Sequence, residues 1–403
     1  MSVFATSAAR LYAASADTAD AAWFEAAPRP APASGRLVSI DALRGLVMLL
    51  MLVDHTREYF YYHAQVGDPM DVAATAPTLF FTRLTAHLCA PVFVVLTGLS
   101  AYLYGIKRTR AETSAFLLKR GAFLIVLELT LVNFAWSFSF TPETMYLQVI
   151  WVIGLSMIAL AALIHLPRPM LIGVGAVIVL GHNLLDPITF AASERGHDLW
   201  AVLHDRGYIA LPWGQARTSY PLLPWIGTIM LGYAVGPWFA RGVAPEQRQR
   251  RLAIAGAAML TGFVLLRGID LYGDAHWHAG VDTLHSVMAF LNVTKYPPSA
   301  DFLLLTLGIG ALLLAMFERV DRSAAWLAIF GSAPLFFYLI HLYVLHAVNK
   351  AAGVAIGADA LVSVPSVAWL WAIAATVAVP AWFACRWFAR LKQTSDQPWL
   401  RYL

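Results

Sequence analysis

The chain has 403 residues, of which 59% are hydrophobic and only 13% are charged. Soluble domains carry roughly a quarter charged residues, so the composition excludes an ordinary soluble protein and indicates a polytopic membrane protein. The net charge of +4 comes from short loops between apolar segments, where membrane orientation explains it, so we expect no nucleic-acid partner.

The first 35 residues are rich in Ala, Ser, Asp and Pro and lack the basic start and continuous apolar core of a signal peptide. We expect residues 1–35 to form a disordered cytoplasmic tail. A membrane domain should cover residues 36–390, and residues 391–403 should form a second cytoplasmic tail.

Ten apolar runs are long enough to cross about 30 Å of hydrocarbon. They lie at 39–62, 80–105, 115–137, 145–165, 169–185, 222–240, 252–272, 301–317, 325–348 and 366–388. The sequence therefore predicts an all-α bundle of about ten transmembrane helices.

The basic residues predict the orientation of this bundle in the inner membrane. With the amino terminus inside, 20 of the 28 Lys and Arg residues fall on the inner side, so both termini should be cytoplasmic. The outer segments 186–221 and 273–300 are long and contain several His and Asp residues. Long segments of this kind are often functional, which predicts a working mouth on the outer face; solvated caps are the alternative.

Arg44 and His55 lie on the first apolar run, eleven residues apart. On a helix this offset returns to one face within about 20° and separates the residues by about 16 Å. An extended pantetheine arm has a similar length, so Arg44 could hold a cofactor phosphate while a thioester reaches His55. An interfacial anchor and a packed histidine are the alternative.

The first run ends in ionisable residues followed by aromatic residues and His63. Such groups usually face a bundle interior or a wet cavity, because burying them in lipid is costly. Glu58 lies one turn beyond His55 and could accept its ring proton, which would leave the other ring nitrogen as a general base. Asp54 and Arg57 form a second pair one turn apart, which we interpret as structural.

Arg83 and His87 lie one turn apart on the second run, before Pro91. The proline should kink the helix near His87 and tilt both side chains toward the mouth. We expect them to support the site or bind an anion; a kinked helix with an interfacial arginine is the alternative.

Tyr220 and Lys295 lie at proline-bearing junctions, Tyr-Pro-Leu-Leu-Pro-Trp and Lys-Tyr-Pro-Pro-Ser, at the outer ends of two runs. Lys295 could bind an acidic group of a substrate, whereas anchoring at the membrane interface would also explain the aromatic residues.

Buried ionisable residues occur elsewhere in the bundle. Glu128 lies near mid-membrane and requires a partner, which we expect from another helix. His341 and His346 are five residues apart and so not on one helix face, and His341 is interpreted as structural. No Cys and His spacing is typical of a zinc site, so we expect no metal.

Four stretches carry a resemblance to known proteins. The motif SIDALRG, with a histidine eleven residues after Arg44, resembles the signature of the membrane acyltransferase superfamily that includes the acyltransferase-3 proteins. RLTAHLCAPVFVVLTGLSAYL, YPLLPWIGTIMLGYAVG and TKYPPS resemble bacterial relatives of the heparan-α-glucosaminide N-acetyltransferase catalytic domain. The resemblance covers about residues 36–390.

This resemblance implies transfer of an acyl group, with acetyl expected, from cytoplasmic acyl-CoA to a sugar hydroxyl or amine outside. Arg44 and His55 match the arginine and histidine of the acyltransferase-3 motif. In the heparan enzyme an asparagine stands at the place of His55, and its catalytic histidine matches Val66. His63 is the nearest histidine to that place and matches only with a gap, so both histidines stay candidates for the base.

The sequence thus predicts an acyl-CoA-dependent O- or N-acyltransferase. Arg44 would bind the donor, His55 with Glu58 or His63 would act in catalysis, and Arg83, His87, Tyr220 and Lys295 would bind the acceptor. The expected partners are acetyl-CoA, an extracytoplasmic carbohydrate or glycolipid, membrane lipid and a second copy in a homo-oligomer. The alternatives are a transporter or flippase of a lipid-linked or anionic sugar, without covalent chemistry, and a non-catalytic membrane scaffold.

Overall fold

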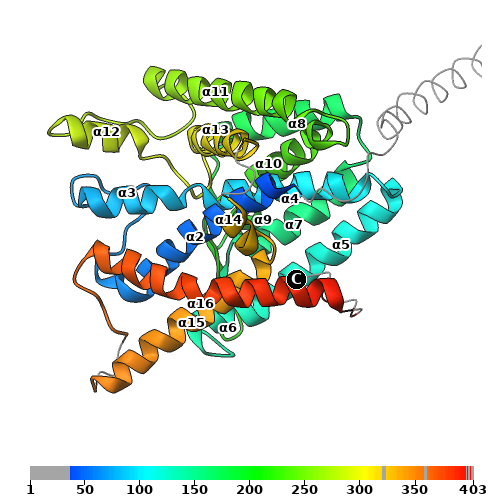
Figure 1. Cartoon of the computed structure of the whole chain (residues 1–403). Helices are drawn as coiled ribbons and strands as arrows, with labels where there is room; N and C mark the ends of the chain where they lie inside the picture. The colour runs from blue at the N-terminus through cyan, green and yellow to red at the C-terminus, as the bar shows by residue number, and fades with distance from the viewer. Residues whose placement is uncertain (1–36, 320–323, 358–360, 396, 398–399, 401–403) are drawn as a thin grey trace, which may run out of the picture.

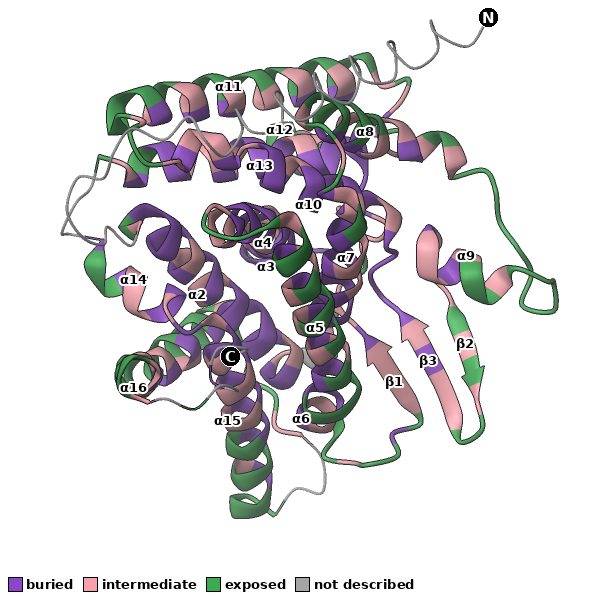
Figure 2. Ribbon diagram, turned by 90° about the vertical axis from the view of Figure 1, so that its right-hand side faces the viewer, coloured by how far each residue is buried: buried purple, intermediate pink, exposed green. Residues whose placement is uncertain are grey.

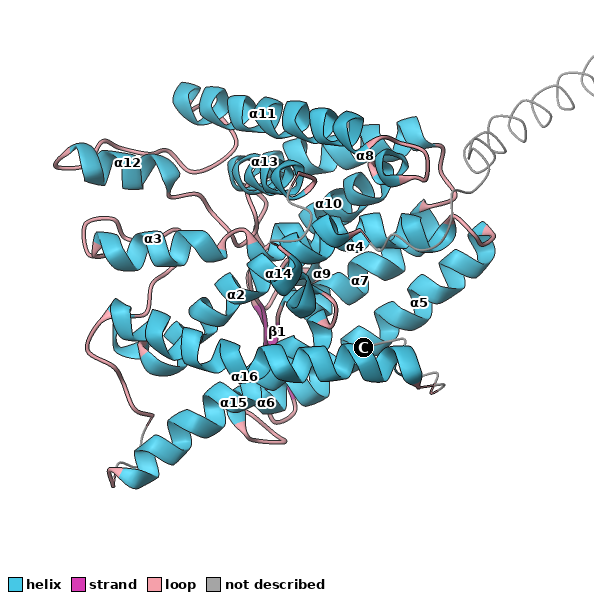
Figure 3. Cartoon of the chain, in the orientation of Figure 1, coloured by secondary structure: helices cyan, strands magenta, loops and turns pink. Residues whose placement is uncertain are grey.

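The computed structural model describes residues 37–319, 324–357 and 361–395, together with Gln397 and Leu400. The described residues are mostly helical (Figure 3), which confirms a predominantly helical fold. The tail expected at residues 1–35 lies outside them.

Helix α2 (Val38–Phe60) runs through the middle of the bundle and is mostly buried (Figures 1 and 2). Three later helices pack against it: α14 (Ala325–Gly331), α15 (Pro334–Ala355) and α16 (Val367–Thr394). The last three described helices therefore pack around the first described one. Helix α16 also continues past residue 390, where we expected a tail to begin.

Glycines allow α2 and α14 to cross at short distance. A Cβ atom at Gly45 would overlap the carbonyl oxygen of Leu327, and one at Gly331 would overlap that of Asp41. Small residues permit such close backbone contact between membrane helices. The crossing places the carbonyl of Gly331 within hydrogen-bond distance of the Arg44 side chain.

The second apolar run forms two helices, α3 (Pro77–Ala86) and α4 (Cys89–Gly105). The break falls at His87 and Leu88, one turn before Pro91. This is the interruption expected where a proline removes a helical hydrogen bond.

The other helices form two neighbouring groups. Helix α5 (Arg110–Leu127) continues through the π-helical turn η2 (Glu128–Val132) into α6 (Asn133–Ser137) and packs against α7 (Val149–Leu163). In the second group, α10 packs against both α4 and α8, and α11 packs against α13. The bounds of its members are α8 (Arg168–Gly181), η3 (His182–Leu185), α10 (Leu223–Ala234), η4 (Gly236–Phe239), α11 (Pro245–Ile269) and α13 (Ala300–Phe317).

A small sheet beside the bundle was not predicted. Strand β3 (Gly214–Thr218) pairs in parallel with β1 (Thr144–Leu147) and antiparallel with β2 (Tyr208–Leu211), as Figure 2 shows. Three short elements complete the loops: η1 (Tyr62–Ala64), α9 (His197–Leu203) and α12 (Thr283–Leu291).

Each of the ten expected runs contains helix, but six helices in the described ranges are long and apolar enough to cross a membrane. The six candidate spans are Pro77–Gly105, Arg168–Leu185, Pro245–Ile269, Ala300–Phe317, Pro334–Ala355 and Val367–Thr394. Helix α2 carries too many charged residues to count among them. Helices α7 and α10, with 15 and 12 residues, are too short. A multi-pass membrane protein is therefore supported, whereas ten spans and cytoplasmic termini stay predictions.

Candidate active site

A cavity of about 380 Å³ lies between α2, α4, α5, α7 and the start of α15. Its lining includes three cationic side chains, Arg44, Arg120 and Lys392. Deeper along α2 its walls include Met51 and Tyr338, and most of its lining is aliphatic or aromatic. The cavity therefore combines three cationic side chains with a largely apolar wall.

Arg44 is held in place by three helices. Its Nη1 donates to the Asp41 carboxylate (2.9 Å) and to the carbonyl of Gly331 (3.1 Å), and its Nη2 donates to Ser100 (3.2 Å). The guanidinium is thus a fixed part of the cavity wall.

Arg120 and Lys392 were not predicted as site residues. They come from α5 and α16, far from Arg44 in the chain, and sequence periodicity within one helix cannot connect them to it.

His55 is buried beyond Met51 and pairs with a second histidine. Its Nδ1 lies 2.7 Å from Nε2 of His341, and the two rings stack with centroids 5.0 Å apart and planes 8° apart. Nδ1 of His341 lies 2.7 Å from the carbonyl oxygen of Phe337, an atom that can only accept. His341 therefore carries its proton on Nδ1 and accepts with Nε2.

This arrangement fixes the protonation pattern of His55. Since Nε2 of neutral His341 accepts, Nδ1 of His55 must donate, which leaves the lone pair of His55 on Nε2. The nitrogen with the lone pair is the one that can take a proton from another molecule.

Two further polar side chains lie beside the His55 ring. The ring of Trp136 lies edge-on to it at 5.2 Å between centroids, and that of Tyr338 at 6.0 Å. Trp136 Nε1 and Tyr338 Oη are buried, and neither makes a hydrogen bond of ordinary geometry within the described residues. Two buried donors, which also interact with each other, therefore lie beside the His55 ring, and Tyr338 lines the cavity as well.

The expected contact between Glu58 and His55 was wrong. Glu58 instead accepts from Nη2 of the neighbouring Arg57 (3.3 Å), while the His55 ring turns toward α15. Residues three apart on a helix are neighbours but still point in directions about 60° apart, so the spacing allowed the contact without requiring it. His341, interpreted from sequence as structural, is the residue that orients His55.

His63 lies on the 3-10 turn after α2 and is exposed. Its ring packs against Tyr61 with 4.4 Å between centroids. Among the described contacts none joins it to His55, so the structure separates the two histidines that the sequence left open.

Arg83 and His87 meet at a buried network near the end of α2. Nη1 of Arg83 donates to Asp54 (2.5 Å) and Nη2 to Asp68 (2.7 Å), and Nε2 of His87 lies 3.4 Å from Asp68. Burial alone would raise the pKa of Asp68, but Arg83, His87 and Lys295 offset this and hold it well below its ordinary value. Asp54 also accepts from Arg57, which confirms that pair.

Tyr220 and Lys295 meet through Tyr296. The Tyr296 hydroxyl donates to that of Tyr220 (3.2 Å), and the Lys295 ammonium lies 5.1 Å from the centre of the Tyr296 ring. Lys295 is only 4% exposed, and its charge acts on Asp68 together with that of Arg83. Both proline-bearing junctions therefore contribute to one region, which we call the mouth: Asp54, Asp68, Arg83, His87, Tyr220, Lys295 and Tyr296.

The partner of Glu128 is the start of a neighbouring helix. The backbone N–H of Gln148, the residue before α7, donates to Glu128 Oε1 (3.3 Å). A carboxylate at a helix N-terminus is stabilised by the exposed amides and the helix dipole. The partner thus lies on another helix, as expected, but it is backbone rather than a cation.

The family described as heparan-alpha-glucosaminide N-acetyltransferase, catalytic, matches residues 36–267, which is more than half of the chain. The match includes α2 with Arg44 and His55 and ends before Lys295 and His341. No curated protein matches the chain.

Proposed function

Because the chain belongs to the heparan-alpha-glucosaminide N-acetyltransferase catalytic family, we propose that it transfers an acetyl group from acetyl-CoA to a sugar hydroxyl or amine. Membership of this family supports membrane acetyltransferase chemistry in general. We propose the donor, the acceptor and the roles of individual residues from the contacts of this chain.

The donor would bind in this cavity. Arg44, Arg120 and Lys392 supply the charge that CoA phosphates require, and the apolar walls suit the uncharged pantetheine arm. The rise of about 1.5 Å per residue places His55 about 16 Å from Arg44 along α2, so an extended arm would bring its thioester near His55.

His55 would act as the general base. The attacking hydroxyl or amine gives its proton to Nε2 as its oxygen or nitrogen bonds to the thioester carbon. When the carbon–sulfur bond breaks, the same proton passes to the leaving thiolate, so that CoA leaves as the neutral thiol. His341 would be a positioning residue that holds His55 in the reactive tautomer.

Tyr338 and Trp136 would stabilise the negative oxygen that forms during attack. Their buried donors lie beside the His55 ring. Donors fixed in a dry site stabilise such an oxyanion more strongly than water does.

The acceptor would bind at the mouth. Lys295 and Arg83 supply positive charge for an acidic group, and Tyr220 and Tyr296 supply hydroxyls and aromatic faces for a sugar ring. The excess of basic residues in the expected inner loops favours a cytoplasmic donor and an extracytoplasmic acceptor.

The observation that carries the proposal is that the cavity lined by three cations is also lined by Tyr338, whose ring lies 6.0 Å from that of His55 between centroids. The test incubates purified protein in lipid nanodiscs with radiolabelled acetyl-CoA, with and without a mixture of amino sugars. We expect acetyl transfer or slow donor hydrolysis by the wild type, a fall of about 10²-fold or more in His55→Ala, and an unchanged rate in the matched control His63→Ala. An equal rate in His55→Ala, or sugar flux without donor, would overturn the proposal.

A further inference from the structure

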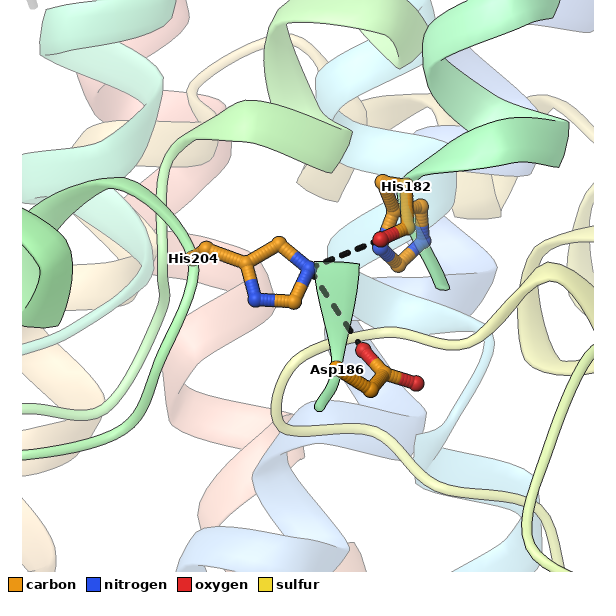
Figure 4. A group of neighbouring side chains, drawn as sticks. All are labelled: His182, Asp186 and His204. Atoms are coloured by element: carbon orange, nitrogen blue, oxygen red, sulfur yellow. Dashed lines mark hydrogen bonds and ion pairs between the residues drawn. The ribbon is translucent and has the colours of Figure 1, made fainter. Parts of the chain in front are cut away.

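Three polar side chains meet beside the end of α8, away from the cavity. His182 begins η3, Asp186 follows it, and His204 is the residue after α9 (Figure 4). One potential ligand atom from each lies within 4.8 Å of the others. Sequence spacing did not reveal this group, because the two histidines are 22 residues apart and meet only when α9 folds back.

The distances suit a small cation. His204 Nε2 lies 3.4 Å from Asp186 Oδ1, and the two imidazole rings are 5.6 Å apart between centroids. Zn²⁺ bonds of about 2.0–2.1 Å in a tetrahedron place neighbouring ligand atoms roughly 3.4 Å apart. The nitrogen and the carboxylate oxygen are already near that separation.

His182 gives an independent indication. The residue is only 2% exposed, and within the described ranges the one polar contact of its ring is with the backbone of Pro298, which leaves at least one ring nitrogen without a partner. A buried polar group without a partner costs about 1–3 kcal/mol, so such a side chain calls for a ligand. His204 is equally buried, while Asp186 is partly open to solvent and gives an entry path.

The surroundings are acidic. A pocket of about 330 Å³ next to the group is lined by Asp186, His204, Asp205 and Asp274. A cation would offset the mutual repulsion of these carboxylates.

We propose that His182, Asp186 and His204 bind a divalent transition-metal ion, with Zn²⁺ as the best fit. Two imidazoles and a carboxylate form a ligand set that favours Zn²⁺ over Ca²⁺ or Mg²⁺. A water molecule in the adjoining pocket can supply the fourth ligand. His204 Nε2 donates to the carbonyl of His182 at 2.9 Å. Metal binding exchanges that hydrogen bond for a bond to the ion and moves the ring proton to Nδ1.

The ion would hold the mouth in shape rather than act in catalysis. The carboxylate of Asp274, which lines the same pocket, accepts from the backbone and hydroxyl of Thr294 and from Ser299. These residues flank the junction that carries Lys295 and Tyr296. An ion at His204 would therefore tie the end of α8 to the segment that builds the mouth.

The test uses the full chain, with any affinity tag removed and metal stripped by a chelator. Zn²⁺ is then titrated calorimetrically, and bound metal is counted by mass spectrometry after desalting. We expect one Zn²⁺ per chain and a rise in the unfolding temperature on binding. His204→Ala and Asp186→Asn should each weaken binding at least ~10-fold. Asp186→Asn keeps the size of a partly exposed side chain, so it tests the site if the histidine variant does not fold.

The matched control is His285→Ala, which removes the histidine of an exposed pair with Asp282 (2.8 Å) on the same chain. It should bind Zn²⁺ like the wild type. Less than one-tenth of an equivalent of zinc in the wild type, equal loss in His285→Ala, or tighter binding of Ca²⁺ than of Zn²⁺ would overturn the proposal. These readouts need no acyl transfer, so they stand apart from the test of the acyltransferase.

Discussion

His55 and His341 lie 286 residues apart in the chain, on two different helices, and a hydrogen bond of 2.7 Å joins their rings. The carbonyl of Phe337 sets the tautomer of His341, and His341 in turn sets that of His55. The pair thus resembles the base and orienting group of other acyl-transfer sites, with an imidazole in the place of the usual carboxylate.

His341→Ala should lower the turnover number by roughly 10²-fold, because His55 then loses the acceptor that keeps its lone pair on Nε2. The KM for acetyl-CoA should change less than threefold. His341→Gln supplies an amide oxygen as acceptor and should restore part of the rate, which a merely structural role would not predict. Steady-state kinetics with radiolabelled acetyl-CoA measure both parameters.

The control for this prediction is His346→Ala. His346 lies on the same helix and is also buried, but its Nδ1 donates to the carbonyl of Ala135 rather than to His55. Turnover should survive in this variant. Equal losses in the two alanine variants would remove His341 from its positioning role.

Tyr338→Phe should lower the turnover number by about 10²-fold with little change in KM, since an oxyanion donor acts mainly in the transition state. The substitution keeps the ring beside His55 and removes only the hydroxyl. Tyr343→Phe on the same helix is the matched control, because its hydroxyl donates to the carbonyl of Leu131. If Tyr338→Phe raised KM alone, its hydroxyl would bind the ground state and not the oxyanion.

The sequence placed Arg44 and His55 on one face because both lie on one continuous helix, where an offset of eleven determines direction. It could not find His341, since no periodicity relates α2 to α15, and it assigned the orienting role to Glu58, the carboxylate one turn beyond His55 on the same helix. Long-range pairs of this kind are decided by helix packing. The same holds for Arg120 and Lys392, which meet Arg44 only in the folded bundle.

At the level of the fold, hydrophobicity located helix in every expected run, because apolar length is the main signal for membrane helices. It did not predict the sheet, whose strands have only four or five residues. The strand Gly214–Thr218 is mostly polar; it gains one partner, β2, across a tight turn and the other, β1, from a distant segment. Short strands in connecting segments give little periodic signal, so tertiary contacts decide them.

Arg44→Ala, Arg120→Ala and Lys392→Ala should each raise the dissociation constant for acetyl-CoA about tenfold or more, because each removes a charged donor worth roughly 1.5–3 kcal/mol. Turnover at saturation should fall much less. Lys119→Ala, next to Arg120 but outside the cavity lining, is the control. Calorimetric titration gives the constants.

Acetyl-dephospho-CoA refines this prediction. The cation that contacts the 3′-phosphate should matter for acetyl-CoA and not for the analogue, whereas the cations at the pyrophosphate should matter for both. If all three alanine variants bind either donor like the wild type, the phosphates bind elsewhere and the cavity is not the donor site.

Asp68→Asn should destabilise the protein at pH 7 by about 3–5 kcal/mol, since it leaves one face of the buried Arg83 guanidinium without its charged partner. The pKa of Asp68 lies well below its ordinary value of 3.8, so the folded state holds the proton less tightly than the unfolded chain does. The stabilisation by the ionised carboxylate is therefore complete above about pH 4 and is lost as the pH falls further. Unfolding followed by tryptophan fluorescence should show a wide gap between wild type and Asp68→Asn at pH 7 that narrows below pH 4. A gap that stays constant from pH 7 to pH 3 would mean that the Asp68 charge contributes nothing to the stability of the mouth.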